Sequence, residues 1–235
     1  MSINREVKVT CPHCDAVSPF QIWLSVNTAQ NPELKGSIRD RSLFQFECPY
    51  CGEKTAVDYG MLYHDPDNKE LIHYAINKEN ADEVYHMLTD DDKKGAFSSI
   101  FDQKYLIRIV RSKNQLLEKL ALFDAEYDDR LIELYKYHLE KAFREEHPES
   151  ENVEILFFSD PEGNPMLQIF NNCETQGVVP LNNSSYYELL QKHEKEMRDF
   201  REDDPVVDQE WVKTFLSPAY FEKPDIPRNT DYEIN

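Results

Sequence analysis

Four of the five cysteines in the chain stand in two short motifs of the form Cys-Pro-Xaa-Cys. The first motif is CPHC at residues 11–14, and the second is CPYC at residues 48–51. Thiols at this spacing have two common uses in proteins, which are reversible disulfide chemistry and the coordination of a metal ion. The residues that follow each pair distinguish between these uses.

Disulfide exchange of the thioredoxin type makes a structural demand that neither motif meets. In such enzymes the pair lies at the N-terminus of a helix, where the helix dipole lowers the pKa of the first thiol. Here Cys14 is followed by DAVSPFQIWLSV, in which Pro19 precedes a β-rich segment. Cys51 is followed by GEKTAVDYG, which also has the composition of a turn and a strand. Thiol exchange is therefore the less favoured interpretation.

The same residues suit a metal site made of four thiolates. Two Cys-Xaa-Xaa-Cys turns supply the ligands of a tetrahedral zinc ion, and Gly52 suits a turn that needs a positive φ. We therefore predict one Zn²⁺ per chain, bound by Cys11, Cys14, Cys48 and Cys51. A site with four protein ligands has no open position, so we expect it to be structural. Iron at the same ligands and four free thiols are the alternatives that stay open.

The charge of the chain limits its partners. The 235 residues carry a formal net charge of −19, and residues 1–64, with six Lys/Arg against seven Asp/Glu, contribute only −1. An acidic body repels phosphate backbones, so we do not expect nucleic-acid binding through the remainder. A nucleic-acid site would need basic and aromatic side chains of the N-terminal part to gather on one face, namely Lys35, Arg39 and Arg41 with Trp23 or Phe44.

Two features bear on the location of the protein. No apolar run approaches the roughly 20 residues that span a bilayer. The first residues, MSINREVKVTCPHC, lack the apolar stretch of a signal peptide. We therefore expect a cytoplasmic protein without a membrane segment, in a compartment where thiols stay reduced or bind metal.

The pattern of residues predicts an α+β protein. The expected fold is an N-terminal antiparallel sheet like that of a zinc ribbon, followed by helices and then by a C-terminal β-hairpin with helices. We place one domain at residues 1–147 and a hairpin–helix segment with a partly irregular tail at residues 148–235. The predicted strands span 7–10, 20–26, 43–47, 55–64, 71–76 and 105–111, with a hairpin made of VEILFF and MLQIF. The first predicted helices lie within 77–97 and over 113–123 and 126–147. A further helix is capped within 183–185 and runs to about Arg201, and the last helix starts at Asp204 and Pro205.

Several motifs resemble those of the CpXC family of bacterial and archaeal proteins, and they occur in the same order. Besides the paired CPHC and CPYCG, they are NPELKG (31–36), FQFECPYCG (44–52), GMLYHDPDNKE (60–70) and FDAEYDDRLIELYK (123–136). The resemblance covers about residues 7–136. Asp15 departs from the pattern, since a glycine is expected after the first pair, and this changes a turn but no ligand. The resemblance implies a metal site and implies no particular reaction.

Other candidate residues have simpler structural interpretations. His13 could replace a cysteine as a ligand, but we expect it to be an exposed loop residue. His64 and Asp65 could form an acid–base pair, although Asp65 suits the turn that follows. Asp128–Arg130 could form a charged site, and we favour helix capping there. We expect Cys173 to be a half-buried structural thiol and Asp90–Asp92 to be a solvated loop.

The sequence points to recognition more than to catalysis. It contains no P-loop, Rossmann fingerprint, Gly-Xaa-Ser-Xaa-Gly or HExxH motif, and it has only six glycines. We expect a module that binds another protein or a copy of itself. A nucleic-acid-binding zinc ribbon and an enzyme with an unrecognised site are the alternatives. Val207, Trp211 and Phe215 form a stripe that either packs on its own domain or contacts a partner.

Overall fold

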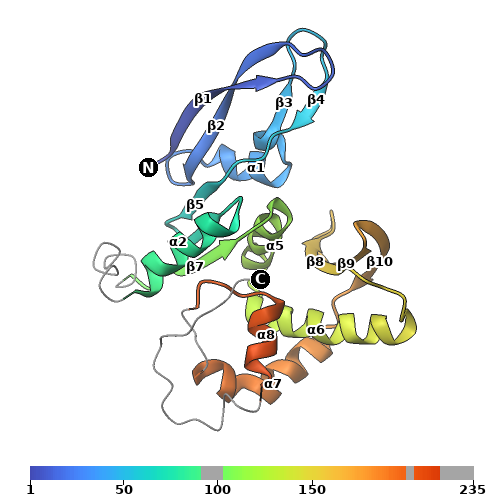
Figure 1. Ribbon diagram of the computed structural model, residues 1–235. Coiled ribbons are helices and arrows are strands. Elements are labelled where there is room, and N and C mark those ends of the chain that lie inside the picture. The colour runs from blue at the N-terminus through green and yellow to red at the C-terminus, as the bar shows by residue number, and fades with distance from the viewer. Residues whose placement is uncertain (91–102, 200–203, 218–235) are drawn as a thin grey trace. The chain divides into compact units, whose positions relative to one another are not determined.

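The computed structural model describes residues 1–90, 103–199 and 204–217, which form an α+β protein as predicted (Figure 1). In chain order, the first elements are β1 (Ile3–Thr10), β2 (Val17–Asn27), α1 (Glu33–Arg39), the 3₁₀ turn η1 (Ser42–Phe44), β3 (Gln45–Glu47), β4 (Lys54–Ala56), β5 (Met61–Asp65), β6 (Glu70–Tyr74), α2 (Lys78–Thr89) and β7 (Leu106–Val110). They are followed by α5 (Lys113–Asp124), α6 (Asp129–Glu146), β8 (Val153–Ser159), β9 (Pro165–Asn171), β10 (Glu174–Pro180), α7 (Asn183–Asp199) and α8 (Gln209–Phe215). No helix among the described residues has the length and apolar character needed to cross a bilayer.

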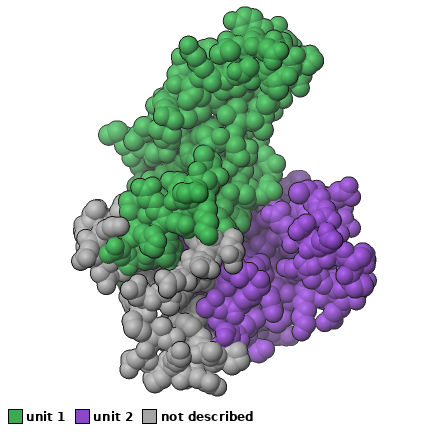
Figure 2. Space-filling model, in the orientation of Figure 1, with its two compact units in different colours: residues 1–117 green, residues 118–235 purple. Residues whose placement is uncertain are grey.

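The chain forms two compact units, Met1–Leu117 and Glu118–Asn235, which Figure 2 colours separately. This division into compact units does not test the domain boundary expected after residue 147, which stays a prediction. The acidic charge is concentrated in the second unit, where 12 Lys/Arg stand against 28 Asp/Glu. The second unit therefore contributes −16 of the net −19, and the first unit is close to neutral.

The main sheet of the first unit has five strands in the order β1-β2-β5-β6-β7. The pairs β1–β2 and β5–β6 are antiparallel hairpins, as expected. The pairs β2–β5 and β6–β7 are parallel, so the sheet is mixed and not wholly antiparallel. Parallel neighbours require a crossover, and the segment between β2 and β5 supplies one through α1 and the separate β3–β4 hairpin.

One face of this sheet is covered by α1 and η1. Leu34, Ile38 and Phe44 are buried there. The ring of Phe44 lies 6.4 Å from that of Tyr74, and Lys35 lies over the ring of Tyr63. The sequence did not predict α1, which is short and contains Gly36.

The segment predicted as one strand over 55–64 is two strands, β4 and β5, that belong to different sheets. Gly60 lies at the break between them. A Cβ atom at this position would come within 2.9 Å of the backbone oxygen of Tyr74. The close approach of two backbones therefore explains both the glycine and the interruption.

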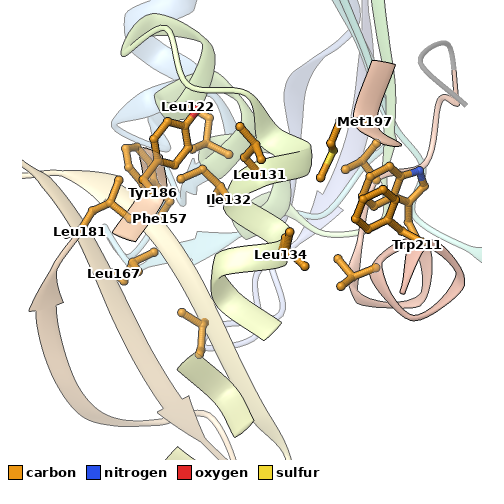
Figure 3. Packing of buried hydrophobic residues seen from close by; sticks show 14 of the residues in the cluster. Leu122, Leu131, Ile132, Leu134, Phe157, Leu167, Leu181, Tyr186, Met197 and Trp211 are labelled. Atoms are coloured by element: carbon orange, nitrogen blue, oxygen red, sulfur yellow. The ribbon is translucent and has the colours of Figure 1, made fainter. Parts of the chain in front are cut away.

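The second unit is built on an antiparallel sheet of three strands in the order β10-β9-β8. The predicted hairpin is present as β8 and β9, and β10 extends it through a tight turn in which Asn172 and Cys173 both have positive φ. A single apolar core joins the sheet to α6, α7 and α8 (Figure 3). Its buried members include Leu131, Ile132, Leu134, Phe157, Leu167, Leu181, Tyr186, Met197 and Trp211.

The C-terminal stripe belongs to this core. Trp211 and Phe215 are 0% and 1% exposed, and their rings stack 5.4 Å apart. The helix that carries them begins later than predicted, because Asp208, and not Asp204, caps it by accepting hydrogen bonds from the amides of Glu210 and Trp211. The predicted irregular tail from residue 218 onward lies outside the described residues.

Candidate metal centre

The first Cys-Pro-Xaa-Cys motif forms the turn between β1 and β2. The amide of Asp15 donates to the carbonyl oxygen of Cys11 at 3.0 Å, and the amide of Cys11 donates to the carbonyl oxygen of Ala16 at 2.9 Å. Asp15 closes the turn with a φ of 56°. This left-handed conformation costs free energy for a residue that has a side chain.

The second motif forms the turn between β3 and β4 with the same hydrogen bonds. The amide of Gly52 donates to the carbonyl oxygen of Cys48 at 2.8 Å, and the amide of Cys48 donates to the carbonyl oxygen of Glu53 at 2.9 Å. Gly52 has a φ of 76° and stands where Asp15 stands in the first turn. The two motifs are therefore two copies of one local structure, and Figure 1 shows the two hairpins side by side.

The two turns bring the four cysteines together. All four sulfur atoms lie within 4.8 Å of one another. The sulfur of Cys11 lies 3.6 Å from that of Cys51, and the sulfur of Cys14 lies 3.6 Å from that of Cys48. Four sulfurs at the usual zinc–sulfur bond length of ~2.3 Å from one tetrahedral ion would lie ~3.8 Å apart. The cluster therefore has the size and the ligand chemistry needed to hold a metal ion.

Each sulfur accepts a hydrogen bond from the backbone amide two residues further along the chain. The amide of His13 lies 3.4 Å from the sulfur of Cys11. The amides of Ala16, Tyr50 and Glu53 donate to Cys14, Cys48 and Cys51 in the same way. Amides that point at sulfur stabilise negative charge there, so the turns favour thiolates over thiols.

Burial and hydrogen bonding shift the pKa values of the thiols in different directions. Desolvation opposes the thiolate at Cys48, but the amides of Tyr50 and Cys51 and the neighbouring thiols lower its pKa to about 7. At Cys51 the amide of Glu53 acts in the same direction, yet desolvation and the thiols of Cys14, Cys11 and Cys48 raise the pKa to about 12. The pKa of Cys14 is also raised. A second thiolate is costly beside the first, and a divalent cation would remove that cost.

Two cysteines of the centre are buried and two are exposed. Cys11 and Cys48 are buried in a small core with Phe46, and the ring of Phe20 packs edge-on against that of Phe46 at 5.9 Å. Cys14 and Cys51 are exposed. Neither pair heads a helix, because β2 follows the first turn and β4 follows the second. The helix-terminal arrangement of a thioredoxin-type pair is therefore absent from both motifs.

Comparison with known proteins identifies the family. Residues 9–136 match the family described as CpXC protein, which is more than half of the chain, so the chain belongs to the CpXC family. The four clustered cysteines all lie within the matched segment. No curated protein and no solved structure matches the chain.

His13 and the proposed pair of His64 and Asp65 have structural surroundings. His13 is exposed, and it is not part of the cluster. His64 and Asp65 are adjacent on β5 and point to opposite faces of the sheet, so they do not form an acid–base pair. His64 bonds to Asn27 and Tyr105, whereas Asp65 accepts hydrogen bonds from Asn68 in the turn, as expected, and from Lys35 and Tyr63.

The residues proposed for a nucleic-acid face are not all exposed, as such a face would need. Phe44 is 2% exposed, and Lys35 forms an ion pair with Asp65 at 3.2 Å. Trp23 is half-buried on β2, and Arg39 and Arg41 are exposed. Only the two arginines of the proposed set are thus fully at the surface.

The remaining candidates divide between confirmation and correction. Asp128 caps α6 by accepting a hydrogen bond from the amide of Arg130, which confirms the capping interpretation. Cys173 is exposed in the β9–β10 turn, so the expectation of a half-buried thiol was wrong. Of the acidic triplet Asp90–Asp92, only Asp90 is among the described residues, so the prediction of a solvated loop stays a prediction.

Sequence reasoning missed a buried network of charges in the second unit. Lys136 lies 3.0 Å from Glu118 and 2.8 Å from Glu133, while Lys119 lies 2.7 Å from Asp129. Desolvation raises the pKa of Glu118, and its carboxylate also accepts the amide of Phe157 on β8 at 2.7 Å. The spacing of Asp129, Glu133 and Lys136 on one face of a helix was the available signal, but it is also typical of a solvated face.

Proposed function

We propose that the four cysteines hold a structural Zn²⁺ that joins the β1–β2 and β3–β4 hairpins into a zinc ribbon, and that this ribbon is part of a protein-binding module. The single observation that supports the metal centre best is the convergence of four sulfurs from two matching turns within 4.8 Å. Zinc suits the ligand set because it favours four thiolates in a tetrahedron and needs no redox partner.

The role of such an ion would be to replace a hydrophobic core. The buried apolar contacts around the centre are few, namely Phe46 with its partly buried neighbours Val9, Phe20 and Val57. β3 and β4 have three residues each, which is too little for an isolated hairpin to be stable in water. In small zinc modules metal binding supplies on the order of 10–16 kcal/mol of folding free energy.

A protein partner is favoured over a nucleic acid and over a small substrate. The acidic second unit would repel phosphates, and a closed four-thiolate centre offers no position for a substrate. Large apolar side chains are exposed close to the centre: Val17 beside the first turn is 52% exposed, and Tyr50 at the tip of the second is 72% exposed. Tyrosine is among the residues that contribute most often to contacts between proteins. A reducing location, the cytoplasm, belongs to the same proposal because it keeps the thiols available for the metal.

Metal content tests the first half of the proposal. The protein is purified without chelator and its metals are measured by mass spectrometry, with the Cys11→Ser and Cys173→Ser proteins alongside. We expect one zinc per chain in the wild type and in the Cys173→Ser protein, and a strong loss in the Cys11→Ser protein. Iron as the main metal would correct the identity of the ion. The absence of bound metal would contradict the centre.

Affinity capture tests the second half. Zinc-loaded wild type and a Tyr50→Ser variant are used as baits in the same native lysate, and self-association is measured separately by sedimentation. We expect a captured protein or a second copy to be lost with Tyr50→Ser while zinc content is kept. Binding that is unchanged in the variant would place the contact elsewhere.

A further inference from the structure

The arrangement of the sulfurs predicts which disulfides the metal-free protein can form. All four sulfurs are close together, and two contacts of 3.6 Å cross between the turns, from Cys11 to Cys51 and from Cys14 to Cys48. We propose that the metal-free cluster is an oxidation site that closes these two disulfides between the hairpins, and not one disulfide within each Cys-Pro-Xaa-Cys turn. The proposal rests on the proposed metal centre, since a bound ion would shield the sulfurs.

Each crossing pair combines an accessible sulfur with a protected one. Cys51 and Cys14 are exposed, and their respective partners Cys11 and Cys48 are buried. An oxidant in solution therefore meets the exposed member first, and the buried member then lies in contact with it. This is the arrangement of a cysteine that reacts with the oxidant and a resolving cysteine beside it.

Once formed, a crossing link would stabilise the folded state more than a link within a turn. Cys11 and Cys51 are 40 residues apart, and Cys14 and Cys48 are 34 residues apart. A disulfide that closes a loop of this length removes far more freedom from the unfolded chain than one that closes a four-residue turn. The turns themselves are already held by the hydrogen bonds from the amides of Asp15 and Gly52.

The chemistry balances with hydrogen peroxide as the oxidant. The exposed cysteine first loses its proton, the resulting thiolate attacks one peroxide oxygen, and the O–O bond breaks to give a sulfenic acid and hydroxide. The buried thiolate then attacks the sulfenic sulfur, the S–S bond forms and a second hydroxide leaves. Each disulfide thus consumes one peroxide and two thiols and yields two waters once the protons are counted. The β1–β2 and β3–β4 hairpins stay joined without the ion.

Peptide mapping distinguishes the two patterns in the full chain. The chelator-treated Cys173→Ser protein is oxidised with hydrogen peroxide, remaining thiols are blocked, and trypsin is added without reductant. Cleavage after Lys and Arg leaves Cys11 and Cys14 on peptide 9–35 and Cys48 and Cys51 on peptide 42–54. We expect one species in which the two peptides are linked. Two separate peptides, each with its own disulfide, would overturn the proposal, as would thiols that stay unpaired.

Double variants assign the pairs. In the Cys173→Ser background, C14S/C48S retains Cys11 with Cys51 and C11S/C51S retains Cys14 with Cys48. The control C14S/C51S retains the two buried thiols, and C48S/C51S retains the pair within the first turn. In glutathione buffers we expect the first two proteins to form their disulfide at about tenfold lower oxidised glutathione than either control. Equal or reversed order would contradict the pairing.

Two measurements keep this test separate from the proposed function. Circular dichroism shows whether each double variant keeps its fold, and where one does not, the peptide map of the four-cysteine protein still distinguishes links between the hairpins from links within the turns. Because every arm uses chelator-treated protein, the outcome does not depend on whether the natural ion is zinc. Failure of the metal centre would be seen in the metal content of untreated protein, and failure of the oxidation site only in the disulfide map.

Discussion

The amino group of Lys136 lies 3.0 Å from the carboxylate of Glu118, and both side chains are withdrawn from water at 8% and 2% exposure. The pair links α5 to α6. Glu118 also accepts a hydrogen bond from the amide of Phe157 on β8. This amide lies on the outer edge of β8, which pairs with β9 on its other side. A carboxylate that accepts an edge-strand amide leaves no donor there for another strand. The two residues thus join three elements of the second unit.

Removal of one member of this pair should be costly. Glu118→Ala would leave Lys136 with only Glu133 and would leave the amide of Phe157 without its acceptor. We expect a loss of about 3–5 kcal/mol in the free energy of unfolding, measured by chemical denaturation, because a buried charge is left uncompensated. The control is Lys213→Ala, which removes an exposed ion pair with Glu210 and should cost about 0–1 kcal/mol. Similar effects of the two substitutions would refute a special role for the buried pair.

The two cysteine turns should respond in opposite ways to substitution at equivalent positions. Asp15 and Gly52 both have a left-handed backbone, with φ of 56° and 76°. Asp15→Gly should therefore stabilise the metal-loaded protein by about 0.5–1 kcal/mol, and Gly52→Ala should destabilise it by about 1–2 kcal/mol. Equilibrium unfolding of zinc-loaded protein measures both, and unchanged zinc content is the control. A loss of stability in Asp15→Gly would show that its carboxylate has a role that outweighs the backbone strain.

Glu70 should make stability fall as pH rises. It is 6% exposed, its Oε2 atom has no hydrogen bond, and desolvation raises its pKa above the ordinary 4.5. A carboxyl whose pKa is raised on folding stabilises the protein while it is protonated, and this contribution is lost as pH rises through the folded-state pKa. Glu70→Gln should therefore gain stability relative to wild type as pH rises above the ordinary carboxyl pKa of 4.5.

The cross-strand partner Asp65 provides the matched control. Desolvation opposes its charge, but hydrogen bonds from Asn68 and the ion pair with Lys35 lower its pKa. Its contribution is present above the ordinary pKa and is lost on acidification, so Asp65→Asn should lose stability relative to wild type at neutral pH. Denaturation at matched pH values compares each variant with wild type. Parallel curves for Glu70→Gln and wild type would disprove the effect.

The C-terminal stripe should be essential to the second unit. Trp211 is fully buried and stacks on Phe215, so Trp211→Ala should cost about 3–5 kcal/mol. Truncation after Arg201 removes both residues and should unfold the second unit, which a loss of helical circular dichroism would reveal. The matched substitution is Tyr187→Ala, since Tyr187 is 58% exposed, and it should change stability little. A truncated protein with the ellipticity of the full chain would refute this assignment.

The clustering of the four cysteines and most elements could be predicted because their signals are local. The spacing within CPHC and CPYC and the strands that follow them indicated two turns that bring cysteines together, and the helices α5 and α6 followed from capping and periodicity. The parallel pairs β2–β5 and β6–β7 could not be predicted, because alternation along a strand does not reveal its neighbour. Glu118 and Lys136 are 18 residues apart in sequence, so their contact depends on how the two helices pack.

The position of β2 has a consequence for what would follow the loss of the proposed ion. Its start, Val17, adjoins the cysteine turn, while only Ser25–Asn27 at its other end pair with β5. At ~3.3 Å per residue, these two ends are about 26 Å apart. Loss of the ion from the reduced protein would thus free the outer end of the strand, while Ser25–Asn27 stay paired with β5 in the central sheet. Chelation would then produce graded hydrogen exchange along a single strand, with protection that fades from Asn27 toward Val17 and no global unfolding.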